Sequence, residues 1–122
     1  MGTCQAGAGA IIRDNMGRLV MAWWEPTPVV SPLHAEAWAM RMGLGLLRAE
    51  QRVEVESDSE WLVKIMREEH PCPWQIKSIV RECKANIDRL AKCTLGHVRR
   101  TSNRVADWAT HRGLGAIQIG MI

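Results

Sequence analysis

The sequence predicts a single α/β domain built around a mixed β-sheet. Segments with the two-residue alternation of strands are interleaved with segments that carry the 3.6-residue repeat of helices, and this mixture is typical of the α/β class. The length of 122 residues suits one domain, which we place at 1–122. With 47% hydrophobic and 24% charged residues the composition is that of an ordinary globular protein, which excludes a disordered, collagen-like or coiled-coil chain.

Eight elements are expected, in the order ββαβααβα. Their residues are 7–13 (strand), 19–24 (strand), 33–49 (helix), 53–56 (strand), 57–69 (helix), 74–91 (helix), 93–98 (strand) and 103–112 (helix). The first two strands form a hairpin, because Asp14, Asn15 and Gly17 between them favour a turn. Three prolines after the second strand end its pairing, since proline lacks the backbone donor.

The helices are identified by their spacing and their end residues. At 33–49 a stripe of His34, Arg41 and Arg48 marks the solvent side, and Ser57 with Glu60 has the spacing of a capping box that begins the next helix. The helix at 74–91 has apolar residues at helical spacing beside a basic stripe. Its apolar positions are Ile76, Ile79, Val80, Cys83, Ile87 and Leu90, and its basic stripe is Lys77, Arg81 and Lys84. For the last helix, Ser102 or Asn103 is the expected cap and Gly113 the end.

The aromatic content consists of six tryptophans, without phenylalanine or tyrosine. Trp38, Trp61 and Trp108 fall inside predicted helices and are expected in the core. Trp23 and Trp24 are adjacent on a strand, so one of them is expected to face outward.

Charge is distributed unevenly along the chain. Residues 1–61 carry 5 basic and 8 acidic side chains, whereas residues 62–122 carry 11 and 5. This asymmetry suits a site that holds cations and binds a polyanion, although taken alone it is better explained by an unevenly charged solvated surface. No apolar run approaches the roughly 20 residues of a membrane span and no secretion signal is evident, so we expect an intracellular protein, in the nucleus or the cytoplasm.

Three acids stand at unusual places. Glu36 falls on the core-facing side of its predicted helix, Asp58 ends a strand and precedes a helix, and Asp107 lies on the last helix. Each has an ordinary explanation: an ion pair with a buried arginine, a helix cap and an exposed acid, respectively. Together, carboxylates from three separate elements are what a hard dication such as Mg²⁺ requires.

Four ordered segments resemble motifs of type-1 ribonuclease H domains. Residues 6–14 with Gly17 are similar to the second and third strands of that family, and residues 34–37 to the helix with its catalytic Glu. Residues 55–59 resemble the strand end with a catalytic Asp, and 97–107 the last signature, with a mobile His and a final Asp. Pro73 and Trp74 fit the plant reverse-transcriptase-like branch, which is associated with retroelements. The resemblance covers about residues 6–113 and leaves 114–122 as a tail.

The resemblance implies a ribonuclease H-like mixed sheet flanked by helices, with a defined set of site residues. Glu36, Asp58 and Asp107 would be catalytic carboxylates that hold Mg²⁺ or Mn²⁺, and His97 would assist proton movement or product release. The residues expected near nucleic acid are Arg99, Arg100, Asn103 and Arg104. The implied reaction is endonucleolytic hydrolysis of the RNA strand of an RNA–DNA hybrid. Because such duplexes are recognised by shape, a double-stranded RNA-like duplex is a second candidate partner, whereas no membrane partner is expected.

One family feature is missing from the sequence. The family carries a further Asp on a first strand at the centre of the sheet, about ten residues before the glycine-rich strand, and residues 1–6 contain no acid. We therefore expect weak activity or none. The alternative is a non-catalytic nucleic-acid-binding module or a retroelement remnant, and an upstream segment with the Asp would instead make the chain a truncated enzyme.

The apparent loss of the first strand leaves the centre of the sheet open to three arrangements. The hairpin at 7–24 and the strand at 53–57 leave a gap, or they pair directly, or the tail supplies a replacement strand. The last arrangement is suggested by the alternation of Ile117, Ile119 and Met121.

A second enzyme class shares part of the pattern. His34 and Glu36 fit the H-x-E of zinc nucleoside deaminases, and Pro71 with Cys72 fits the start of their P-C-x-x-C. Position 75 is Gln, however, so the third zinc ligand of that motif is absent.

Overall fold

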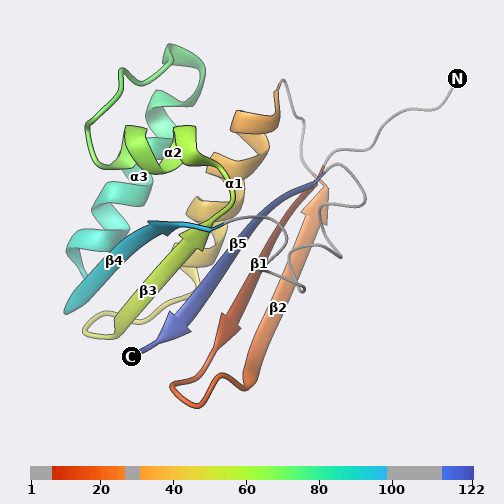
Figure 1. Cartoon of the computed structure of the whole chain (residues 1–122), viewed down its shortest axis with the longest axis vertical. Helices are drawn as coiled ribbons and strands as arrows, with labels where there is room; N and C mark the ends of the chain where they lie inside the picture. The colour runs from red at the N-terminus through yellow and green to blue at the C-terminus, as the bar shows by residue number, and fades with distance from the viewer. Residues whose placement is uncertain (1–6, 27–30, 99–113) are drawn as a thin grey trace, which may run out of the picture.

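The computed structural model describes residues 7–26, 31–98 and 114–122, which form one mixed sheet with helices packed against it (Figure 1). The strands are β1 (Gly7–Arg13), β2 (Leu19–Pro26), β3 (Arg52–Ser57), β4 (Lys92–His97) and β5 (Leu114–Met121). The helices are α1 (Pro32–Gly45), α2 (Glu60–Met66), the 3-10 turn η1 (Trp74–Ile76) and α3 (Lys77–Asp88). The predicted α/β class is confirmed, and the helix expected at 103–112 lies outside the described residues.

The strands are arranged in the order β2-β1-β5-β3-β4. The predicted hairpin of β1 and β2 is antiparallel, and β3 and β4 are parallel. The turn between β1 and β2 depends on Asp14, whose Oδ1 accepts hydrogen bonds from the backbone N–H of Met16 at 2.9 Å and of Arg18 at 2.8 Å. Gly17 has a positive φ of 79°, a conformation that glycine adopts without strain.

The C-terminal strand β5 occupies the centre of the sheet (Figure 1). It runs parallel to β1 and antiparallel to β3, and Ile117 and Ile119 are completely buried. This confirms the replacement strand and rules out both a gap and direct pairing of β1 with β3. Because β1 and β3 run in opposite directions, an inserted strand is parallel to one and antiparallel to the other in either direction. Residues 114–121 can therefore pair with both β1 and β3 without a change in the direction of either strand.

The core lies between the helices and one face of the sheet. All sheet residues of the buried cluster occupy alternate positions that share this face, namely Ala8, Ile12, Val53, Val55, Ile117 and Ile119. Helix α1 packs on β1 and β5, and a Cβ at Gly43 would lie only 3.0 Å from Cδ1 of Ile119 and 3.1 Å from Cβ of Ala10. A glycine in the last turn of α1 thus permits the close approach of the helix to the central strand.

The opposite face of the sheet is more polar. Glu54 and Glu56 of β3 lie there in register with Gly120 and Gln118 of β5. Partial burial, followed by the charge of Glu54, raises the pKa of Glu56. Among the described residues, no helix has the length and apolar character needed to cross a bilayer.

Several predicted boundaries shift. Helix α1 ends at Gly45 instead of 49, and α3 begins after the 3-10 turn η1 and ends at Asp88. The capping box predicted at Ser57 is wrong: Ser57 is a buried residue of β3, and the cap of α2 is Ser59, whose Oγ accepts from the N–H of Leu62 at 3.1 Å. The strand continues one residue further than the local pattern indicated because β4 and β5 pair with it up to Ser57.

The predictions for the tryptophans are partly wrong. Trp38 is half-buried against the core, but Trp61 is 47% exposed. Both Trp23 and Trp24 are exposed, although they lie on opposite faces of β2. The reason is that β2 is an edge strand that stands beyond the layer of helices (Figure 1). Trp108 lies outside the described residues.

The position of β5 leads to a stability prediction. Ile119→Ala is expected to lower the free energy of unfolding by about 2–5 kcal/mol, because it opens a cavity beneath α1. Gln118→Ala, on the other face of the same strand, is the matched control and is expected to have a much smaller effect. Urea denaturation of both variants measures the difference, and equal effects would contradict a central position for β5.

Candidate active site

The carboxyl ends of β3 and β4 bring two of the predicted site residues together. Ser57 and His97 are register partners at the ends of this parallel pair, and the N–H of Val98 donates to the carbonyl of Ser57 at 2.9 Å. Asp58 follows directly, and Nε2 of His97 lies 3.2 Å from its backbone carbonyl oxygen. The parallel pair thus places an acid and an imidazole at the carboxyl ends of its strands, where α/β proteins place their sites.

Glu36 reaches the same region from α1. The helix begins at Ser31, whose Oγ accepts from the N–H of His34 at 3.1 Å, with Pro32 as the first helical residue. This start places Glu36 in the second turn, half-buried, while Met40 and Gly43 further along the same stripe are buried. Glu36 thus lies on a stripe that is buried further along the helix, whereas its own side chain is only partly buried.

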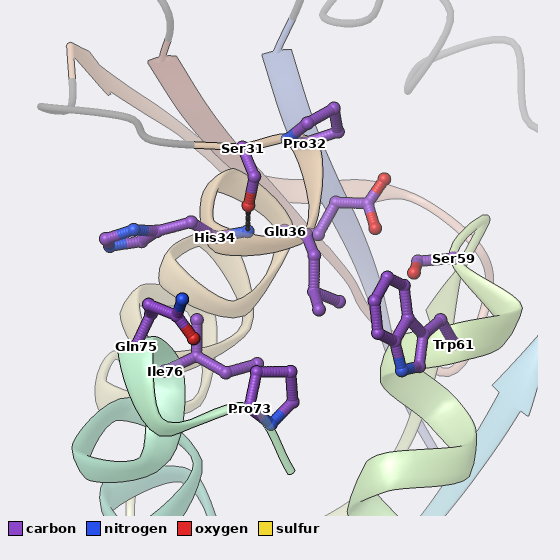
Figure 2. Close-up of a pocket in the computed structure, with 10 residues that line it drawn as sticks. Ser31, Pro32, His34, Glu36, Ser59, Trp61, Pro73, Gln75 and Ile76 are labelled. Atoms are coloured by element: carbon purple, nitrogen blue, oxygen red, sulfur yellow. Dashed lines mark hydrogen bonds between the residues drawn. The ribbon is translucent and has the colours of Figure 1, made fainter. Parts of the chain in front are cut away.

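A pocket of about 570 Å³ lies between the beginnings of α1, α2 and α3. Its lining includes Glu36, Ser59, Trp61, Pro73 and Gln75. Glu36 extends toward the side on which Ser59 and Trp61 lie, whereas the ring of His34 points the other way (Figure 2). Since Ser59 is the residue after Asp58, the pocket adjoins the edge formed by β3 and β4.

Trp61 forms one wall of this pocket. Its place inside a predicted helix had indicated a core position instead. Its Nε1–H donates to Nδ1 of His70 at 3.1 Å, and the two rings meet edge-on with centroids 5.6 Å apart. The only available sequence signal was its place in the first turn of a helix that begins at the site edge. His70 was likewise not identified as a residue of this region.

Glu60 adds a further carboxylate near the edge. A hydrogen bond from Lys64, then the charge of Lys64 and the charge of His97, lower the pKa of Glu60. The Nζ of Lys64 lies 3.0 Å from its Oε1. Glu60 therefore stays ionised at neutral pH.

Two of the three predicted metal ligands, Glu36 and Asp58, lie among the described residues. Glu36 and Asp58 offer the carboxylate oxygens that Mg²⁺ prefers. In the described part of the chain, however, no three His, Cys, Asp or Glu side chains gather as a metal site would require, so neither a complete magnesium site nor the zinc site of a deaminase is present there. Asp107 and the nucleic-acid contacts Arg99, Arg100, Asn103 and Arg104 lie outside the described residues.

The contact of Trp61 with His70 leads to a spectroscopic prediction. His70→Phe keeps an aromatic ring but removes the nitrogen that accepts from the indole N–H of Trp61. The indole N–H resonance of Trp61 is therefore expected to shift in ¹H–¹⁵N spectra of this variant. The resonance of Trp38, whose indole N–H donates to Glu25, should stay in place. An unchanged Trp61 resonance would contradict the hydrogen bond.

Comparison with protein families gives a match to the reverse transcriptase-like family over residues 1–113. Comparison with curated proteins and with solved structures gives no significant match. The family match includes all the motifs that predicted a ribonuclease H-like domain, and the order of helices and strands described above agrees with it. The chain therefore belongs to the reverse transcriptase-like family of ribonuclease H-like domains.

Proposed function

We propose that this domain binds RNA–DNA hybrids and hydrolyses their RNA strand weakly or not at all. Family membership and the meeting of Asp58 with His97 beside a pocket lined by Glu36 support a nucleic-acid site. The basic second half of the chain supports binding of a polyanion. Recognition by duplex shape and backbone would make the binding largely independent of sequence.

The composition of the central strand is the observation that supports weak or absent hydrolysis. β5 lies beside β3, and Ile117 is the register partner of Ser57, the residue before Asp58. Residues 114–121 contain no Asp or Glu. The strand that completes the sheet therefore contributes backbone and apolar side chains, and it contributes no carboxylate to the site.

The remaining residues have distinct proposed roles. Glu36 and Asp58, with Asp107, would hold Mg²⁺ or Mn²⁺, which when bound stabilises negative charge at a phosphate. His97, held beside Asp58, would take up or release a proton at its imidazole nitrogen. Arg99, Arg100, Asn103 and Arg104 would contact the nucleic-acid backbone.

A labelled RNA–DNA hybrid tests the proposal, with double-stranded RNA and single-stranded DNA of the same sequence as competitors. We expect retarded mobility that weakens with salt, and slow cleavage or none in Mg²⁺ or Mn²⁺. Asp58→Asn should abolish any cleavage, whereas Glu54→Gln, an exposed acid of the same strand, should leave it unchanged. Binding without cleavage identifies a binding module, and absence of both would overturn the proposal.

Restoring a carboxylate on β5 provides a second prediction. Gly115 is in register with Ala8, so position 115 shares the face of Ile117 and Ala10, on which α1 packs, whereas position 116 lies on the other face. Helix α1 and β5 also begin at the same end of the sheet (Figure 1). Gly115→Asp is therefore expected to bring a carboxylate toward Glu36 and Asp58.

Gly115→Asp should strengthen Mn²⁺ binding by at least about tenfold, since opposite unit charges about 4 Å apart near a protein surface attract by about 4 kcal/mol. Ala116→Asp adds the same charge on the opposite face and is the matched control. Calorimetric titration with Mn²⁺ and the hybrid cleavage rate are the two measurements, with circular dichroism to confirm folding. Equal responses of the two folded variants would contradict the proposed geometry.

A further inference from the structure

Strand β2 presents an unusual concentration of exposed apolar side chains. Five of its residues are large, apolar and between 39% and 57% exposed: Leu19, Val20, Met21, Trp23 and Trp24. They occupy both faces of the strand, because successive residues alternate. Exposed apolar side chains gathered on one strand in this way are typical of a protein–protein contact.

The backbone of β2 is also open to pairing. β2 is the last strand of the sheet, and its neighbour in the described part of the chain is β1 alone. At the other end of the sheet, β4 carries exposed polar residues at Lys92, Thr94 and His97, which discourage pairing with a further strand. β2 has no lysine and a single charged residue, Glu25. The two edges of one sheet are thus protected differently.

The charge pattern of β2 favours a second copy of the same strand. Glu25 lies near its end, where its carboxylate accepts from Nε1 of Trp38 at 2.8 Å. Arg18 lies just before its start and pairs with Asp14 at 2.8 Å, and Arg13 beside them leaves this end of the hairpin with a net positive charge. In an antiparallel pair related by a two-fold axis, each Glu25 approaches the Arg18 end of the partner strand, and the two Glu25 residues lie at opposite ends of the contact. The uncharged middle, around Met21 and Ala22, then meets itself.

We propose that the domain forms a two-fold symmetric dimer in which β2 pairs antiparallel with β2 of a second copy. The two sheets join into one, and the exposed tryptophans of both faces are covered by apolar residues of the partner strand. The described helices lie to one side of β2 in Figure 1, away from the edge at which a second sheet would pair. This interface is at the opposite end of the sheet from His97, and it does not depend on the proposed activity.

Sedimentation and light scattering from low micromolar to near-millimolar protein test the dimer. The expected mass at high concentration is twice the 13.7 kDa of the monomer. Trp24→Lys places a charge in the paired surface and should return the mass to that of the monomer, a twofold decrease. Thr94→Lys makes the same addition on the other edge strand, β4, and should leave the dimer intact.

Hydrogen exchange at the backbone amides of β2 in the wild-type protein tests the dimer independently, even if Trp24→Lys fails to fold. In the wild-type protein, outward-facing amides of β2 should become protected as concentration rises, while those of β4 should not. A protein that stays monomeric over the whole range, or a dimer that Thr94→Lys disrupts and Trp24→Lys does not, would overturn the proposal. Irregular higher oligomers without protection of β2 would also overturn it.

Discussion

The insertion of β5 between β1 and β3 is the constraint on which the rest of the structure depends. On one side stands the hairpin of β1 and β2, and on the other the parallel pair of β3 and β4. Backbone hydrogen bonds on both sides of β5 join these two halves, and Ile117 and Ile119 fill the space beneath α1. Removing the strand would expose two rows of unpaired backbone groups and an apolar floor, both of which are costly in water.

The same strand completes the sheet beneath the candidate site but supplies no acidic side chain to it. The site edge receives Asp58 and His97 because β3 and β4 are held parallel and in register, and this register depends on a continuous sheet. β5 supplies that continuity without supplying an acid. A ribonuclease H-like domain can thus keep the fold, the pocket and part of the charged site, while lacking a carboxylate at the centre of the sheet.

The exposed tryptophans discussed above lie at the pocket and on the edge strand β2. Trp61 is exposed at the pocket because it begins a short helix, α2, whose buried side is made of Leu62, Val63, Ile65 and Met66. Trp23 and Trp24 are exposed because α1 packs on β1 and β5 and leaves β2 uncovered. Neither outcome follows from hydrophobicity alone, since the layer that covers a side chain is set by the packing of whole elements.

The sequence by itself determined the fold class, the hairpin and the stripe of α1 on which Glu36 lies, because alternation, turn chemistry and helical spacing are local patterns. It also suggested β5 through the alternation of Ile117 and Ile119, but a gap or direct pairing of the neighbouring strands was open as well. Only the tertiary structure decided that β5 fills the centre, that Ser59 in place of Ser57 caps α2, and that Trp61 lines the pocket. Each of these depends on which segments distant in sequence meet, and that is settled by the burial and hydrogen bonding of the whole sheet.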